Sequence, residues 1–297
     1  MAERTARAAG SIYDLGYRSY TGERLGRPYA VFSLFVFSLR AVFGLGRSAW
    51  AKVLAFGLAF VALLPAFVQL AVAALAPVEF EYAEPATYFG LFTIVLVLFC
   101  GATAPEIVGR DQRNKTLALY FSRSLSRVDY VAAKLAALTA ALLAVQLLPQ
   151  ALLVIGNAVA TEDVMQGLAD DADLVPPILA SSLLAALAMA ALSLAIASQT
   201  PRRAWSTGAL VVFFVISTTL GETLAETLTG DARQYSMLIS PIGVLEGTAY
   251  WMFDVAPDEE SGLAKAGLEG GYYLLAALGY SLLAGAVLFR RFLRLSV

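Results

Sequence analysis

The sequence predicts an all-α membrane protein with six transmembrane helices. Of its 297 residues, 59% are hydrophobic and 15% are charged, whereas a soluble domain carries about 25% charged residues. Six runs have the length and apolar character that a bilayer-spanning helix needs, about 20 residues each. Basic residues also concentrate in alternate connecting segments, which is typical of a polytopic membrane protein.

The six runs are separated by polar or charged segments. We expect the spans at Lys52–Leu75, Thr87–Ala104, Val131–Val159, Leu174–Ser198, Ala204–Leu220 and Gly271–Phe289. Pro65 and Pro149 fall inside the first and third runs. Neighbouring helices can satisfy the carbonyl groups that a proline frees, so both runs still qualify as spans.

The charges of the connecting segments predict the orientation. The segment up to Lys52 holds eight of the 21 Lys and Arg residues, residues 106–134 hold six, the loop after the fourth run two and the C-terminal tail three. The opposite loops hold only Arg233 and Lys265, and Asp and Glu dominate them. Because basic segments stay in the cytoplasm, both termini are expected there.

Residues 1–50 are expected to form a cytoplasmic N-terminal segment that precedes a transmembrane domain at 51–297. Residues 12–28 are either an irregular tail or a segment folded against the cytoplasmic face. Tyr29–Trp50 follows, and its uninterrupted apolar part, Tyr29–Leu39, is too short to cross the membrane. We therefore expect an amphipathic helix in the membrane interface, with a seventh span as the alternative.

A second apolar stretch, Tyr235–Phe253, lies in the long acidic loop before the sixth run. Ser240, Pro241 and Gly247 interrupt it, so it is not expected to span. Its exposed aromatic residues would make an unusual surface loop. We expect one or two short helices that enter the outer leaflet like a reentrant segment or cap the bundle.

The composition removes several kinds of chemistry. The chain has no histidine and one cysteine, Cys100, so no disulfide within the chain, catalytic triad or zinc site is expected. No phosphate-binding GxxxxGK[ST] motif is present. We expect no enzyme active site, no metal, no cofactor and no nucleic-acid partner.

The polar residues expected inside the spans, such as Gln146 and Gln150, are uncharged, which disfavours a proton-coupled carrier. An ATP-independent carrier or channel stays open as an alternative function.

The most informative stretch is Glu106–Lys134, which we call the basic segment. It connects the second and third spans and contains a short helical candidate, Asn114–Ser122, with Leu117, Tyr120 and Phe121 as its apolar residues. One interpretation is that these residues form a surface that binds a soluble partner. The alternative is an apolar face that packs on the helix bundle.

The basic segment resembles the first cytoplasmic loop of ABC-2 type transporter permeases, the membrane subunits of many bacterial ABC exporters. The shared features are Glu106, the basic pair Arg110 and Arg113, Thr116-Leu117, Ser122, Ser126-Arg127, Tyr130 and Lys134. Lys115 and Ser124 depart from the glycine and proline usual in the family, but the spacing is intact. The N-terminal YRSYTGERLGR and the six-span layout are also similar to this family.

The resemblance implies a permease that pairs with a second copy or a related chain in the bacterial plasma membrane. Two separate ATPase subunits would bind ATP and Mg and dock on its cytoplasmic face. The residues implied in coupling are Asn114, Lys115, Thr116, Leu117, Tyr120, Phe121, Arg123 and Arg127, with Glu106, Arg110 and Arg113 as support for the loop. Leu117, Tyr120 and Phe121 would be the anchors, and the two later arginines would contact the rim.

Overall fold

The computed structural model describes residues 21–22, 25–46, 49–75, 85–122, 125–160 and 163–294. These residues form helices and contain no strand. Six of the helices are long and apolar enough to cross a membrane. The predicted class, an all-α multi-pass membrane protein, is confirmed.

The six long helices match the six predicted spans in order. They are α2 (Ala49–Leu75), α3 (Pro85–Ala104), α6 (Arg127–Ala160), α8 (Val175–Ala197), α9 (Arg203–Thr227) and α13 (Gly270–Arg294). Several extend beyond the apolar runs. In particular, α6 begins before the predicted third span, and α9 continues past Leu220 to include Glu222 and Glu226. Helix α9 therefore carries two acidic residues beyond the end of the predicted fifth run.

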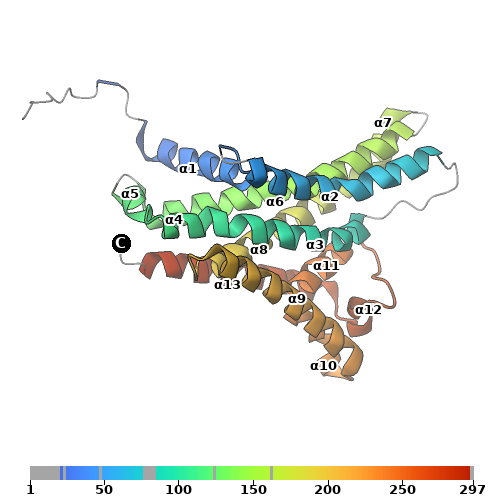
Figure 1. Cartoon of the computed structure of the whole chain (residues 1–297). Coiled ribbons are helices and arrows are strands. Elements are labelled where there is room, and N and C mark those ends of the chain that lie inside the picture. Colours follow the sequence, from blue (N-terminus) through green and yellow to red (C-terminus); the bar gives the residue numbers. More distant parts are fainter. Residues whose placement is uncertain are drawn as a thin grey trace, which may run out of the picture.

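The short elements gather at the two ends of the bundle (Figure 1). One end holds α4 (Arg110–Arg113), α5 (Leu117–Phe121), the start of α6 and the end of α13; we call it the basic end. The opposite end, which we call the acidic end, holds α7 (Val164–Asp170), α10 (Asp231–Gln234) and α12 (Gly262–Ala266). The charge pattern of the sequence predicts that the basic end faces the cytoplasm.

Helix α8 is the most enclosed of the long helices. It packs against α6 and α13, and many of its buried residues are alanines, among them Ala186, Ala190 and Ala197. Small side chains let helix backbones approach closely, which is how membrane helices gain packing energy. By contrast, α2, α9 and α13 leave most of their surface outside the core.

Helix α1 (Gly26–Val42) runs alongside α6 at the basic end (Figure 1). Its buried residues, Leu34, Ser38 and Val42, recur every four positions and so share one face. The helix stops at Val42, and Trp50 belongs to α2 with 83% of its surface exposed. The predicted helix Tyr29–Trp50 is therefore two helices, because the chain turns at Gly44, where φ is +65°.

The stretch before the sixth span forms η3 (Ser236–Ile239) and α11 (Pro241–Met252). The Ser240 hydroxyl accepts a hydrogen bond from the Gly243 amide and starts α11, and Pro241 occupies the first position of the helix. Helix α11 is largely buried against α13, α3, α8 and α9. The prediction of short helices that cap the bundle without spanning is confirmed.

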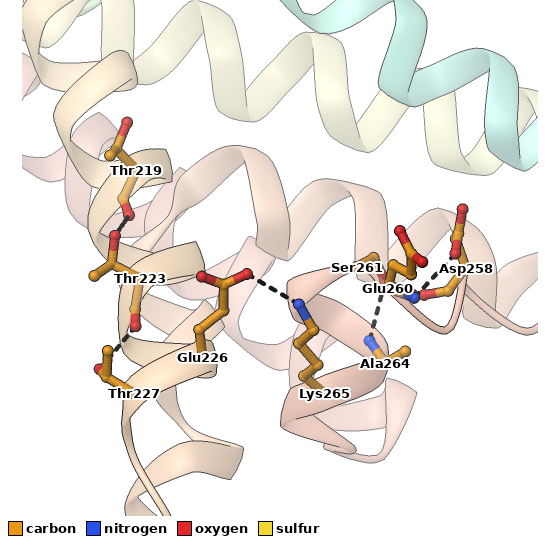
Figure 2. A network of polar contacts seen from close by, with 9 residues as sticks. All are labelled: Thr219, Thr223, Glu226, Thr227, Asp258, Glu260, Ser261, Ala264 and Lys265. Carbon is orange, nitrogen blue, oxygen red and sulfur yellow. Dashed lines mark hydrogen bonds and ion pairs between the residues drawn. The ribbon is translucent and has the colours of Figure 1, made fainter.

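Polar contacts hold the acidic end together (Figure 2). Lys265 on α12 forms an ion pair of 2.9 Å with Glu226 on α9, and the Ser261 hydroxyl accepts a hydrogen bond from the Ala264 amide. On α9, Thr223 and Thr227 donate back to carbonyls four residues earlier. Of these contacts, the Lys265–Glu226 ion pair connects the long acidic loop to the end of the fifth span.

Candidate functional site

The basic segment begins as a continuation of the second span. The π-helical turn η1 (Pro105–Gly109) joins α3 to α4 without a break, so one helical rod runs as far as Arg113. The predicted helix Asn114–Ser122 is shorter, because only Leu117–Phe121 are helical. Asn114 ends α4, with its amide donating to the Arg110 carbonyl, and Lys115 and Thr116 form the turn into α5.

Lys115 stands in the left-handed region, with φ of +53°. That region is strained for a residue with a Cβ atom and free of strain for glycine. The departure from the family pattern therefore falls at a position whose backbone favours the glycine usual there. Its side chain is exposed, as are those of Asn114 and Arg113.

Substitution at this turn separates the effect of backbone conformation from the effect of the side chain. We expect Lys115→Val to lower the free energy of unfolding by about 1–2 kcal/mol relative to Lys115→Gly, because a β-branched residue tolerates positive φ poorly. Unfolding of the purified chain in mixed micelles measures the difference. Equal stability of the two variants would contradict the backbone explanation.

The three predicted anchors face the bundle. Leu117 is 7% exposed and belongs to the core. The rings of Tyr120 and Phe121 lie 5.7 and 5.8 Å from the ring of Tyr130, which is fully buried and packs on Phe292 at 5.2 Å. The alternative interpretation, an apolar face packed on the bundle, accounts for these contacts. Tyr120 and Phe121 keep part of their surface accessible, whereas Leu117 leaves little for a partner.

The exposed apolar residue of α5 is Leu119, which the sequence interpretation did not select. Its exposed fraction is 68%, and its neighbour Ala118 is exposed as well. A helix of five residues has only one inward face, so the side chains between the inward positions must point away from the bundle. The direction in which α5 packs was needed to distinguish Leu119 from Leu117.

Arg127 holds the end of the last span. Its guanidinium donates hydrogen bonds to the carbonyls of Leu293 at 2.7 Å and Phe292 at 3.3 Å, and it lies 5.6 Å from the centre of the Phe121 ring. A cation near the C-terminal carbonyls of a helix is favourable. These contacts tie α6 to α13. Arg123 and Ser124 lie outside the described residues.

A buried ion pair joins α4 to α6. Lys134 lies 2.8 Å from the carboxylate of Asp111 and also donates to the Ile107 carbonyl at 3.0 Å. The Tyr130 hydroxyl donates to the same carboxylate at 2.8 Å. Lys134 and Asp111 are 3% and 7% exposed, so each charge depends on the other for compensation. The sequence pointed to Lys134 only as the end of the basic segment, and the pairing with Asp111 was not foreseen.

Two further contacts connect the basic segment to α8 and α9. Glu106 is buried and forms an ion pair of 2.8 Å with Arg203 at the start of α9. The Gln112 side-chain amide donates to the Ser198 carbonyl, just after α8, at 3.0 Å. Glu106, which was predicted to support the loop, is therefore one of the residues that attach it to the bundle.

The start of α6 is anchored to α1 as well. Ser126 and Asp129 form a reciprocal cap, in which the Ser126 hydroxyl accepts from the Asp129 amide and the Asp129 carboxylate accepts from the Ser126 amide. Arg27 forms a two-point ion pair with the same carboxylate, both nitrogens at 2.9 Å. The basic segment thus lies within one network that includes α1, α6, α8, α9 and α13.

A second polar group that sequence reasoning missed lies toward the acidic end. Glu246 on α11, outside the six candidate spans, approaches Gly90 so closely that a Cβ atom there would lie 2.8 Å from its carboxylate. Burial and, second, the charge of Glu222 raise the pKa of Glu246 from 4.5 to about 7. Two acidic side chains from α9 and α11 are therefore close neighbours.

Comparison of the chain with models of known protein families and with curated proteins gives no match. The class of protein therefore rests on the fold, which is that of a multi-pass α-helical membrane protein. Between the second and third spans, the described residues include the short helix α5, which lies in a segment attached to the bundle by charged and aromatic contacts.

Proposed function

We propose that this chain is the permease subunit of an ATP-driven ABC exporter of the bacterial plasma membrane. Separate ATPase subunits would dock on the basic end through α5 and the turn before it. One observation carries the proposal: the basic segment exposes Leu119 at its tip and is tied to the bundle through Asp111–Lys134 and Glu106–Arg203. A partner that moved α5 would therefore move the helices behind it.

The proposed movement would be transmitted through the contacts that the basic segment makes with the second and fifth spans. Helix α4 continues from α3, the second span, and Glu106 links the same rod to α9, the fifth span. Thr207 on α9 also donates to the Gly101 carbonyl on α3 at 2.7 Å. Closure of the ATPase subunits would shift these two spans together as a rigid unit and change access to a central path.

The outer face of these two spans suits a second permease copy. A groove of about 230 Å³ lies between α3 and α9, lined by Ile94, Val97, Phe214 and other residues, of which three are threonines and the rest are apolar. Ile94 is 72% exposed, and Val215 is 55% exposed. In the proposed dimer, this face would meet the same face of the partner and enclose the path.

The test uses the chain coexpressed with an ABC ATPase subunit from the same genome. We expect Leu119→Asp to reduce the copurified ATPase at least about tenfold, because a charge at the centre of an apolar contact removes a main anchor. Leu25→Asp is the matched control, since Leu25 is also an exposed leucine and lies two positions before Arg27, which pairs with Asp129 at the start of α6. ATP turnover by the complex should fall in the first variant and persist in the second.

Substitutions of Leu117, Tyr120 or Phe121 are a poorer test, because they disturb packing on Tyr130 whether or not a partner binds. Unchanged copurification and turnover in Leu119→Asp would contradict docking through α5.

An ATP-independent carrier is the second candidate, and the neighbouring acids Glu222 and Glu246 favour it. Carboxylates within a helix bundle commonly bind the coupling ion of a carrier. Transport by the purified chain alone in liposomes would support this candidate. A strict requirement for the ATPase and ATP would support the exporter.

A further inference from the structure

A groove of about 480 Å³ lies between α1 and α4. Its α1 side carries Tyr29, Phe32, Val36 and Phe37, and the turn after α1 closes it. The rings of Tyr29, Phe32 and Phe37 each expose more than half of their surface. The groove therefore presents an aromatic and aliphatic wall to the surroundings of the protein.

Two arginines enter this apolar groove from different helices. Arg40 lies in the last turn of α1, and Arg110 is the first residue of α4. Neither guanidinium forms an ion pair or a hydrogen bond with another residue that the structure describes. No Asp or Glu lines the groove. The adjacent carboxylate, Asp111, is already engaged by Lys134.

Three other arginines at this end differ in that respect. Arg27, Arg127 and Arg203 each have a carboxylate or carbonyl partner within the chain. Two uncompensated guanidinium groups beside an apolar wall are complementary to an amphiphile with an anionic head. Arginine binds phosphate oxygens in a two-point geometry, and its charge attracts anionic lipids at a membrane surface.

We propose that the groove between α1 and α4 binds an anionic phospholipid. The phosphate lies between Arg40 and Arg110, and the acyl chains lie along the aromatic face of α1. A lipid held in this way would connect α1 to the rod formed by α3, η1 and α4. The proposal does not depend on coupling to an ATPase.

Native mass spectrometry of the full purified chain tests the proposal. The chain in detergent is titrated with dioleoylphosphatidylglycerol or with dioleoylphosphatidylcholine, which have the same acyl chains and different headgroup charge. We expect one phosphatidylglycerol to be retained in preference to phosphatidylcholine. Arg40→Gln/Arg110→Gln should weaken the binding of phosphatidylglycerol at least about tenfold, because each arginine supplies a charge-assisted bond to the headgroup.

Two control variants test whether lipid retention depends on the positive charges of the groove. Arg202→Gln removes an exposed arginine just before α9, outside the groove, and should leave lipid retention unchanged. Arg40→Lys/Arg110→Lys keeps both charges and should retain most of the phosphatidylglycerol. Arg40→Gln alone, on the exposed end of α1, provides the measurement if the double variant does not fold. Equal retention of the two lipids, or equal loss in Arg202→Gln and the groove variants, would overturn the proposal.

Discussion

Lys134→Met is expected to lower the free energy of unfolding by about 3–5 kcal/mol, because it leaves the buried carboxylate of Asp111 without a cation. The carboxylate would keep only the hydrogen bond from Tyr130, at 2.8 Å. The Ile107 carbonyl would lose its donor in the same substitution. Both losses occur where the basic segment joins α6, so the loop should loosen before the rest of the bundle.

Unfolding in mixed micelles, followed by circular dichroism, measures this effect. Asp111→Asn/Lys134→Met should recover most of the lost stability, because replacing both partners removes the uncompensated charge. Arg27→Met is the control for an exposed ion pair, since the Arg27 side chain is 60% exposed, and it should cost about 0–1 kcal/mol. A Lys134→Met effect no larger than that of Arg27→Met would contradict a structural role for the buried pair.

Gly44→Ala is expected to destabilise the chain by at least about 3 kcal/mol, because two separate costs combine at this position. The φ of +65° is strained for alanine. A Cβ atom would also lie 2.6 Å from the Ala51 carbonyl carbon and 2.8 Å from the Lys52 nitrogen. Those atoms belong to the backbone of α2, which cannot yield as a flexible side chain would.

Gly46→Ala separates the two costs. Gly46 also has a positive φ, of +83°, but a Cβ atom there meets nothing within 4 Å. It should therefore cost only about 1–2 kcal/mol, the strain of the backbone alone. Thermal unfolding of both variants in the same detergent gives the comparison. Equal losses would show that contact with α2 contributes nothing at Gly44.

Much of the architecture was predictable, because membrane-spanning helices can be recognised in a sequence by their length and apolar composition. An apolar run of about 20 residues can satisfy its backbone hydrogen bonds in lipid only as a helix, so the six spans follow from local sequence. The breaks at Ser240 and Pro241 likewise predicted short helices before the sixth span. The ends of the helices were less predictable, because α9 extends through polar residues that protein contacts such as Lys265–Glu226 accommodate.

The basic segment could be selected from the sequence as a region of interest. The contacts that its individual residues make could not be predicted. Arg127 was predicted to contact a partner, yet it binds the carbonyls at the end of α13, which lies 165 residues away in the chain. Glu106 was predicted to support the loop, but its ion pair with Arg203 was not foreseen. A long-range ion pair leaves no periodic pattern in the sequence, because both residues look like ordinary members of a charged loop.

The sequence by itself determined the class of protein and the number and order of the spans. Only the tertiary structure decided which face of α5 is outward, that Asp111 and Lys134 compensate each other, and that Arg40 and Arg110 meet beside one groove. The physical reason is that helix formation in a membrane depends on local hydrophobicity and backbone hydrogen bonding. Side-chain direction and charge pairing depend on which distant residues the packed helices bring together.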